Sequence, residues 1–268
     1  MNPPVPAGAG APAVVVYAQR ERARAIVRVA FPRRRVRVVL TRTFEDFEAA
    51  FKTHLVDAAI VDVGGGHEDT WRVAARAREY PSVPFFGLAP LRANEGPAIA
   101  QCAQYEFADT LIDGVDDCAA RDLVMHVSFS TRFARALELP PAALGLQTAL
   151  QGAAWRWVVA GAGRPVRTSA LAEALDVTRE HLSRSFSAGG APNLKRVIDL
   201  VRIVAAAELA KNPGYDLRDV AHVLGFASSS HLSSTAMRVV GTKPTSLARL
   251  RTVDLVDRFA RGHGRSRG

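Results

Sequence analysis

One segment of the first half, Asp57–Gly66 (DAAIVDVGGG), places a single carboxylate after an apolar run and follows it with three glycines. Such a run is typical of a buried β-strand that delivers one acid to the edge of a sheet. Asp62 is therefore a candidate nucleophile for phosphoryl transfer. The alternative is that Asp62 is an acid retained at the end of a strand. The glycines carry neither a dinucleotide fingerprint nor a P-loop lysine, so they indicate a turn between strand and helix.

Two segments of the second half repeat a different pattern. LAEALDVTREHLSRSF covers Leu171–Phe186, and VAHVLGFASSSHLSSTA covers Val220–Ala236. Each predicts a short helix, a tight turn with an apolar plug (Val177 or Phe226) and a second helix. This arrangement is the helix-turn-helix, whose second helix enters the major groove of DNA.

Each predicted recognition helix begins at a capping residue, because Thr178 and Ser228 stand where an N-cap hydroxyl is favoured. The residues 193–212 between the two units contain little that would break a helix. A helix of about 18 residues is about 27 Å long. That length suits two recognition helices that enter successive major-groove faces, which are about 34 Å apart.

The net charge of +9 is confined to one half of the chain. Residues 1–150 hold 17 basic and 17 acidic side chains, whereas residues 151–268 hold 18 and 9. A neutral half joined to a basic half predicts two domains, of which the second meets a polyanion. Only four of the 35 basic residues are lysine, and a general preference for arginine does not explain this confinement.

The first half alternates apolar strand candidates with helical segments. This alternation predicts βαβ units and a five-stranded parallel α/β sheet covered on both faces. The functional crevice of such a sheet lies at the carboxyl ends of its strands, where Asp62 is expected. The predicted strands are 13–18, 35–42, 57–63, 83–89 and 109–113, with helices over 19–31, 44–54, 70–80 and 94–106.

The alternation, with Asp57 five residues before Asp62, resembles the receiver domain of bacterial response regulators over about residues 12–125. The resemblance implies a flavodoxin-like fold and a phosphorylated aspartate on the third strand. It also implies an acidic pair that helps to hold Mg²⁺, a hydroxyl residue after strand four and a lysine after strand five. Three of these four parts are absent, because their positions hold Tyr17, Ala18, Gln19, Ala89, Asp113 and Gly114. Phosphoryl transfer needs a metal and a cation to neutralise charge, so Asp62 is expected to be a structural acid.

Two helix-turn-helix units joined by one helix resemble the AraC/XylS family of bacterial transcription regulators over about residues 148–251. The linking helix keeps Arg202 before AAAELAK, and the second unit keeps Gly225, Phe226, Gly241 and Pro244 at the family's spacing. The resemblance implies that bases are read by exposed residues of both recognition helices: Arg179, Glu180, Ser183 and Arg184 in the first, and Ser229, Ser230, Ser233 and Ser234 in the second.

The two recognition helices differ in what they offer to DNA. Arg184 can pair bidentately with guanine, or alternatively clamp a phosphate, and Glu180 can accept from cytosine. The family commonly has an arginine where Ser234 stands and an aromatic residue where Ala236 stands. Serine reads bases less sharply, so the first unit is expected to carry most of the sequence specificity. His181 and His231 lack partners for zinc and are expected to pack or to meet phosphate.

The predicted organisation has five parts. Over 116–138 a long helix carries an apolar stripe (Leu123, Val127, Phe129, Phe133 and Leu137), which either packs on the sheet or continues into a dimer seam. The segment LPPAALG breaks this helix and links the domains. The parts are a disordered leader (1–12), a receiver-like domain (13–138), a linker (139–147), a double helix-turn-helix domain (148–255) and a basic tail (256–268).

These features predict a sequence-specific, DNA-binding transcription regulator of the cytoplasm, not an enzyme, whose receiver-like domain dimerises or senses a signal or partner without phosphorylation. Double-stranded DNA is the expected partner, RNA polymerase and a second copy are further candidates, and no cofactor, metal or membrane contact is expected. The alternatives are a response regulator phosphorylated at Asp62 and a non-specific nucleic-acid-binding protein. An enzyme of the α/β half lacks a nucleophile–base pair, a metal cluster and a cofactor loop.

Overall fold

The computed structural model describes residues 10–187 and 190–264 of the chain. They form two compact units. The first, the α/β unit, comprises Ala11–Arg132 together with Asn212–Tyr215, and the second, the helical unit, comprises Phe133–Lys211 and the residues from Asp216 on. The boundary after Arg132 lies six residues before the predicted end of the receiver-like domain at 138. The predicted leader falls mainly on residues 1–9, outside the described residues.

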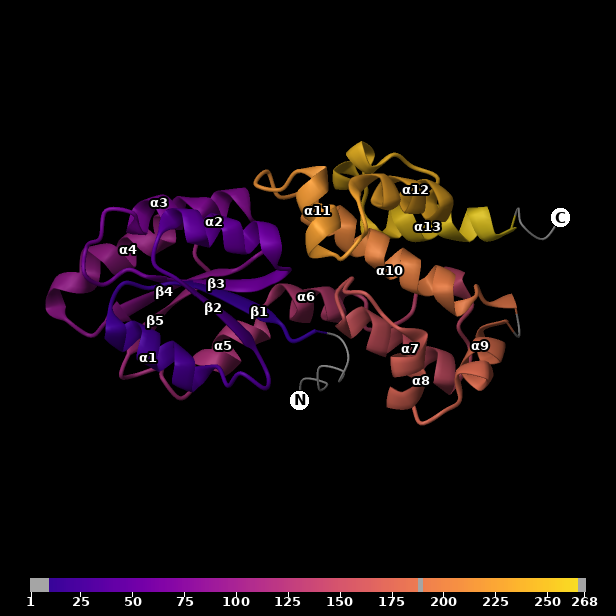
Figure 1. Cartoon of the computed structure of the whole chain (residues 1–268), viewed down its shortest axis with the longest axis horizontal. Helices are drawn as coiled ribbons and strands as arrows, with labels where there is room; N and C mark the ends of the chain where they lie inside the picture. Colours follow the sequence, from indigo (N-terminus) through magenta and orange to yellow (C-terminus); the bar gives the residue numbers. More distant parts are fainter. Residues whose placement is uncertain (1–9, 188–189, 265–268) are drawn as a thin grey trace. The chain divides into compact units, whose positions relative to one another are not determined.

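The α/β unit is built on a five-stranded parallel sheet, as the sequence predicts, in the order β2-β1-β3-β4-β5 (Figure 1). Parallel pairing is shown by the register, in which Val15 lies between Val39 and Ala59. The strands are β1 (Ala13–Tyr17), β2 (Arg37–Thr41), β3 (Val56–Asp62), β4 (Phe85–Pro90) and β5 (Asp109–Asp113). The helices are α1 (Glu21–Ala30), α2 (Phe44–Thr53), α3 (Thr70–Ala74), α4 (Gly96–Gln104) and α5 (Ala120–His126), with 3₁₀ turns η1 (Ala75–Glu79) and η2 (Ala93–Glu95).

Helices cover both faces of this sheet, so β1, β3 and β4 are buried along their whole length. Figure 1 shows α1 and α5 on one face and α2, α3 and α4 on the other. On the α1 face, Val27 and Val124 pack with Ile60 in one apolar core. On the α2 face, Phe51 stacks on Phe85 with ring centroids 5.8 Å apart. Burial on both faces is what a parallel sheet requires, and it explains the continuous apolar runs.

The strand order fixes the place of the crevice. In this open parallel sheet, β2 lies on one side of β1 and β3 lies on the other. The strand order therefore reverses direction between β1 and β3, and the carboxyl ends of these two strands flank the topological switch point. Asp62 is the last residue of β3 and its side chain is buried. The expected placement of Asp62 at the crevice is confirmed.

Asp57 has a different role at the opposite end of β3. Its side chain is fully buried, and its carboxylate accepts hydrogen bonds from the backbone N–H of Ala13 at 2.9 Å and of Ser130 at 3.1 Å. A buried carboxylate that accepts two backbone hydrogen bonds satisfies amides that would otherwise be unpaired. Asp57 therefore joins the start of β1 to the segment that follows α5.

The helix predicted over 116–138 is two helices, α5 and α6 (Phe129–Ala136). Val127 ends α5 with a non-helical backbone, and Ser128 begins the next helix with its hydroxyl near the N–H of Thr131 (3.4 Å). A serine side chain that bonds nearby backbone groups is favoured at such a break. The apolar stripe is divided accordingly: Phe129, Phe133 and Leu137 are buried, whereas Leu123 is 41% exposed.

The helical unit holds seven further α-helices among its described residues. Figure 1 shows the long α10 between α7–α9 and α11–α13. The helices are α7 (Ala149–Ala160), α8 (Thr168–Ala174), α9 (Arg179–Ser187), α10 (Leu194–Leu209), α11 (Leu217–Val223), α12 (Ser229–Val240) and α13 (Thr252–Gly264), with 3₁₀ turns η3 (Ala142–Leu144) and η5 (Pro244–Arg249).

Helix α10 is the core element of this unit. It has 16 residues, from Leu194 to Leu209, and 12 of them are buried. Asn193 caps its start, since its side chain accepts from the N–H of Arg196 at 2.9 Å. Neighbours therefore surround most of α10, which is how it can support a helix pair on each side.

The segment after residue 255 differs from the predicted basic tail. Helix α13 runs to Gly264, and Leu255, Val256 and Phe259 on it are buried. Apolar residues at this spacing form one face of a helix, which packs into the core of the unit. Residues 265–268 of the predicted tail lie outside the described residues.

Both helix-turn-helix turns need a residue with a left-handed backbone. Gly225 has φ +63° in the second turn, and Asp176 has φ +53° at the matching place in the first. An L-residue pays a steric cost in this conformation, whereas glycine does not. A Cβ on Gly225 would also lie 2.7 Å from Cγ of Pro165.

Replacing Gly225 with alanine is therefore expected to destabilise the helical unit by about 2 kcal/mol or more, from the left-handed backbone and the contact with Pro165. Gly152 is the matched control, because it lies inside α7 and a Cβ there would meet only Arg156 at 3.6 Å. Gly152→Ala is expected to stabilise by roughly 0.5–1 kcal/mol. Thermal unfolding followed by circular dichroism measures both, and a stabilised Gly225→Ala variant would contradict the assignment of the turn.

Candidate functional site

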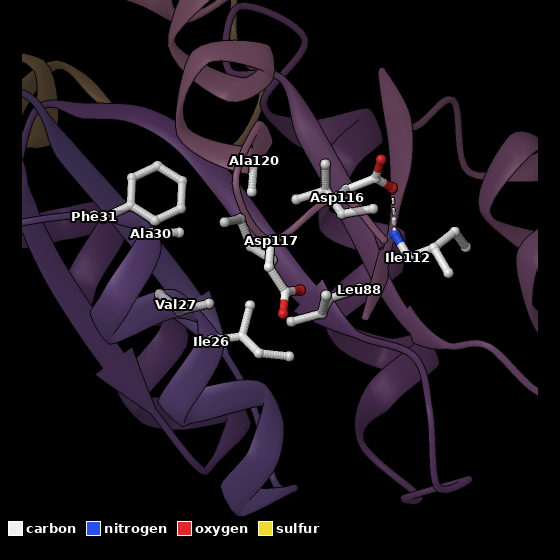
Figure 2. Close-up of a pocket in the computed structure, with 11 residues that line it drawn as sticks. Ile26, Val27, Ala30, Phe31, Leu88, Ile112, Asp116, Asp117 and Ala120 are labelled. Atoms are coloured by element: carbon white, nitrogen blue, oxygen red, sulfur yellow. Dashed lines mark hydrogen bonds between the residues drawn. The ribbon is translucent and has the colours of Figure 1, made fainter. Parts of the chain in front are cut away.

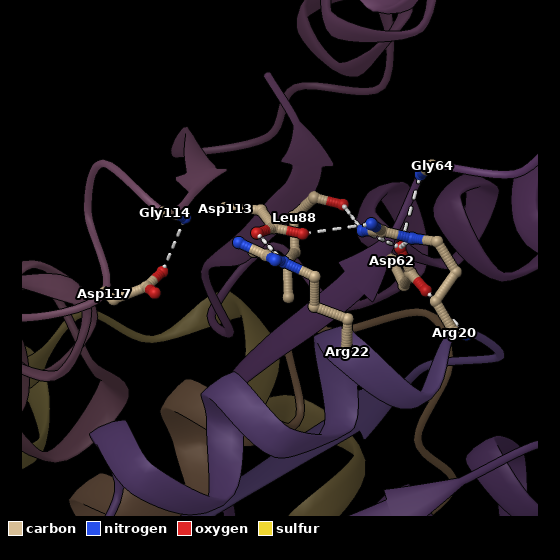
Figure 3. A network of polar contacts seen from close by, with 8 residues as sticks. All are labelled: Arg20, Arg22, Asp62, Gly64, Leu88, Asp113, Gly114 and Asp117. Atoms are coloured by element: carbon tan, nitrogen blue, oxygen red, sulfur yellow. Dashed lines mark hydrogen bonds and ion pairs between the residues drawn. The ribbon is translucent and has the colours of Figure 1, made fainter. Parts of the chain in front are cut away.

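The carboxylate of Asp62 is held by the residue that follows β1 and its loop. Arg20 reaches it with its side chain, through Nε at 2.8 Å and Nη2 at 2.6 Å to Oδ1, and with its backbone N–H at 3.1 Å to Oδ2. The N–H of Gly64 approaches Oδ1 at 3.3 Å. Figure 3 shows the guanidinium lying directly against the carboxylate. Such charge-assisted contacts are among the strongest that a carboxylate makes.

The same guanidinium also contacts an acid at the end of β5. Arg20 Nη1 lies 3.1 Å from Asp113, which also accepts from Nε of Arg22 at 2.6 Å (Figure 3). Arg20 donates further to the carbonyl of Leu88 at 3.4 Å. Two carboxylates and two guanidinium groups thus form one cluster at the carboxyl ends of β1, β3 and β5, here called the crevice cluster (Arg20, Arg22, Asp62 and Asp113).

Burial raises the pKa of Asp62 above its ordinary value, and hydrogen bonds and charge from Arg20 oppose that shift in part. The carboxylate is therefore desolvated and also hydrogen-bonded to Arg20 and Gly64. Such a group is a poor nucleophile, because its oxygens already accept from a cation and from two backbone amides.

The crevice cluster does not fit Mg²⁺. The ion takes several oxygen ligands in near-octahedral geometry. Tyr17, Ala18 and Gln19 supply no carboxylate where the resemblance implies an acidic pair, and a guanidinium occupies the space beside Asp62. Over residues 10–187 and 190–264, no group of three or more His, Cys, Asp or Glu side chains could hold a metal ion.

Arg20 is a residue of this cluster that the sequence pattern does not predict, unlike Asp62. The signal was present, since an arginine directly follows the first strand and its loop, at the edge where parallel strand ends meet. What the pattern could not give is the direction of the side chain. Arg20 lies across two strand ends and bonds both acids.

A cavity lies on the α1 face of the sheet. Ile26, Val27, Phe31 and Leu88 are among its apolar lining residues, and Asp116 closes one side, where its carboxylate accepts from the N–H of Ile112 at 2.7 Å (Figure 2). Its volume is about 10 Å³, which is room for about one water molecule. This cavity is too small for an organic ligand.

The first recognition helix is α9. Thr178 caps it, as predicted, because its hydroxyl accepts from the N–H of His181 at 3.1 Å. Leu182 and Phe186 bury the inner face of the helix completely. The opposite face is open: all four predicted base-reading residues of this helix are exposed, namely Arg179, Glu180, Ser183 and Arg184.

The second recognition helix is α12, capped by Ser228, whose hydroxyl accepts from the N–H of His231 at 3.1 Å. Leu232 anchors it in the core. Of its four predicted base-reading residues, two are exposed (Ser230 and Ser234) and two are half-buried (Ser229 and Ser233). The hydroxyls of Ser233 and Ser234 donate to the backbone carbonyls of Ser229 and His231.

The two histidines that precede the anchoring leucines have different surroundings. His231 packs edge-on against Phe226, with ring centroids 5.5 Å apart, and its Nδ1 lies 3.4 Å from the N–H of Ala227. Both His231 and His181, which lies on α9, are exposed. His231 thus packs on Phe226, and phosphate contact stays a prediction for both histidines.

None of the helices within the described part of the chain is both long and apolar enough to cross a membrane.

One comparison with known proteins matches part of the helical unit. Residues 171–249 match the family described as "Helix-turn-helix domain". Among solved structures, the chain is similar to full-length FixJ from B. japonicum, at 12% identity and a TM-score of 0.37, over 90% of this chain and 98% of that one. No curated protein matches. The C-terminal part of the chain is a helix-turn-helix domain of the AraC type, which implies a DNA-binding transcription regulator.

Proposed function

We propose that the chain is a sequence-specific transcription regulator of the cytoplasm that reads a bipartite site in double-stranded DNA. The observation that carries this proposal is the pair of capped recognition helices, α9 and α12, on either side of α10 within the matched domain. The 16 residues of α10 span roughly 24 Å, which suits entry into successive major-groove faces. One copy would then read two half-sites that need no palindrome.

The base-reading residues in this proposal are those of the two open helix faces. Arg179, Glu180 and Arg184 give α9 charged groups that can discriminate guanine and cytosine. On α12, two of the four serine hydroxyls already donate to the helix backbone, which leaves that face less able to read bases. We therefore assign most of the specificity to α9 and backbone contacts with a looser preference to α12.

The α/β unit is proposed to work without phosphorylation, in dimerisation or in sensing a signal or partner. The crevice cluster supports this, because Arg20 fills the place beside Asp62 that a metal ion and a phosphoryl group would need. Leu123 on α5 offers an exposed apolar residue for a second copy. RNA polymerase is a further proposed partner of the whole regulator. The proposed domains remain 13–138 and 148–255, extended by helix α13 to Gly264.

The test of phosphorylation independence is incubation of the full chain with acetyl phosphate and Mg²⁺, followed by intact-mass spectrometry and DNA binding. We expect no added phosphate and an unchanged affinity for DNA. Asp62→Asn is the control, since it keeps the shape of the side chain, and it should bind DNA as the parent chain does. Stoichiometric phosphate that is absent from Asp62→Asn, with a changed DNA affinity, would establish a phosphorylated response regulator instead.

A further inference from the structure

Arg202 lies in the middle of α10 and reaches the turn of the second helix-turn-helix unit. Its Nη2 donates to the carbonyl of Leu224 at 3.0 Å and to the carbonyl of Gly225 at 3.3 Å. Both carbonyls belong to the turn that ends α11, where backbone acceptors are left without helical partners. A cation at this end of a helix is favoured by the helix dipole as well.

The guanidinium also covers the apolar plug of that turn. Cζ of Arg202 lies 3.9 Å from the ring centroid of Phe226. This ring also contacts His231 in the first turn of α12, at 5.5 Å between centroids and an interplanar angle of 78°. One line of contacts thus runs from α10 through Arg202 and Phe226 to the start of the second recognition helix.

This arrangement places a charge where water is scarce. Burial lowers the pKa of the Arg202 guanidinium, and Asp199 on the same helix opposes the shift in part. An apolar side chain of similar length would fill the space without a desolvation cost. An apolar side chain could not donate to the carbonyls of Leu224 and Gly225. The desolvation cost of Arg202 is therefore offset by hydrogen bonds that hold the turn in place.

A second contact braces α12 at its other end. Arg238 donates to the carboxylate of Asp199 at 2.9 Å, and that carboxylate is 9% exposed. Helix α12 is therefore tied to α10 near both ends, by Arg202 through the turn and by Arg238 directly.

We propose that Arg202 is a positioning residue for the second recognition helix and sets how firmly the half-site under α12 is held, without touching DNA itself. This inference rests on the proposed reading of a bipartite site. It adds a residue outside both recognition helices to those that determine DNA affinity.

The test uses the full chain and duplexes that it selects from a random DNA pool. Arg202→Met is expected to lower the affinity about tenfold, because hydrogen bonds from a charged donor are lost. In hydroxyl-radical footprints at fixed salt, protection should fade over one half-site and persist over the other. The half-site of α12 is identified as the one that stays protected in a Glu180→Ala, Arg184→Ala variant, which weakens the half-site of α9.

Two further variants separate positioning from loss of charge. Arg196→Met removes an arginine from the same helix that also lies over an aromatic ring, Phe259, at 5.0 Å, and it should leave both half-sites equally protected. Arg202→Lys keeps a cation near Phe226 and should restore part of the lost protection. Even weakening of both half-sites in Arg202→Met, or affinity equal to that of the parent chain, would overturn the inference.

Hydrogen exchange decides the question without DNA. Amides of residues 226–232 should exchange faster in Arg202→Met than in the parent chain, while those of the first turn and α9 should not change. If Arg202→Met does not fold, Arg202→Lys and Phe226→Leu are measured in the same way, and unchanged exchange over 226–232 in both would overturn the inference. A pool that yields no preferred sequence would refute the proposed function, and the exchange result would still stand for or against Arg202.

Discussion

Loss of sequence discrimination by roughly 30-fold or more is expected when Glu180 and Arg184 are both replaced with alanine. Each bidentate pair between a side chain and a base is worth about 1–3 kcal/mol of discrimination. Both side chains are exposed on α9, and the helix itself is anchored by Leu182 and Phe186, so it should keep its structure. The measurement is the ratio of specific to non-specific affinity at one salt concentration, with a duplex selected from a random pool.

The matched control is the pair Ser230→Ala and Ser234→Ala on α12, which removes two exposed hydroxyls from the other recognition helix. We expect at most a few-fold change in the same ratio, since serine reads bases less sharply. A larger loss in the serine pair than in the Glu180 and Arg184 pair would reverse the assignment of specificity. A ratio near one for the parent chain would mean that the protein binds DNA without sequence preference.

Arg184→Lys separates the two roles open to this residue. Lysine keeps the charge but cannot form the planar, bidentate pair with guanine. If Arg184 reads a base, discrimination should fall with this variant nearly as far as with alanine. If it clamps a phosphate, discrimination should be retained, and the affinity for all sequences should stay close to that of the parent chain.

Arg20→Ala is expected to destabilise the α/β unit by about 3 kcal/mol. Removal of one partner from a buried ion pair leaves an uncompensated charge and costs about 3–5 kcal/mol. The lower end applies here, because the Arg20 side chain is 20% exposed and water can reach part of the site, whereas that of Asp62 is fully buried. Urea unfolding measures the loss, and hydrogen exchange should place it in β1 and β3 while α10 is unchanged.

The loss should depend on pH in a defined direction. Burial already raises the pKa of Asp62 in the folded chain, and removal of Arg20 takes away the groups that oppose this rise. A carboxyl whose pKa is higher in the folded state favours folding below its unfolded pKa, and this contribution is lost as pH rises through the folded value. The destabilisation in Arg20→Ala should therefore be largest near neutral pH, shrink as the pH falls through the folded pKa of Asp62, and be smallest below about pH 4, the ordinary pKa of an aspartate.

Arg22→Ala serves as the control for this prediction. Arg22 also bonds Asp113, but its side chain is 70% exposed, and Arg20 remains to hold the same carboxylate. A smaller change than in Arg20→Ala is expected. Equal losses in the two variants would contradict the assignment of Arg20 as the centre of the crevice cluster.

Much of the fold could be predicted because burial leaves a periodic trace in the sequence. Strands such as Val56–Asp62 are apolar on both faces, and the helices between them carry a single apolar face, so the alternation alone predicts a parallel sheet. The double helix-turn-helix was predicted from a repeated pattern, and Thr178 and Ser228 cap the recognition helices where expected.

The misses have physical causes as well. The break between α5 and α6 depends on the backbone of Val127 and the hydroxyl of Ser128, which a helical apolar stripe does not reveal. The spacing of Leu255, Val256 and Phe259 is that of one helix face and could have predicted α13. The basic residues around and after them instead favoured the prediction of a tail. The crevice cluster was missed because Arg20 and Asp62 are 42 residues apart, and only the strand order brings them together.

Asp57 brings the two ends of the main segment of the α/β unit close together. One carboxylate bonds the amide of Ala13, where the chain enters the unit, and that of Ser130, two residues before the chain leaves its main segment. The two ends of that segment are therefore only a side chain's width apart. Chains with adjoining ends tolerate circular permutation and transplantation into the loop of another protein. A short linker from residue 132 to residue 11 should thus close the segment into a ring, with new ends opened elsewhere on its surface.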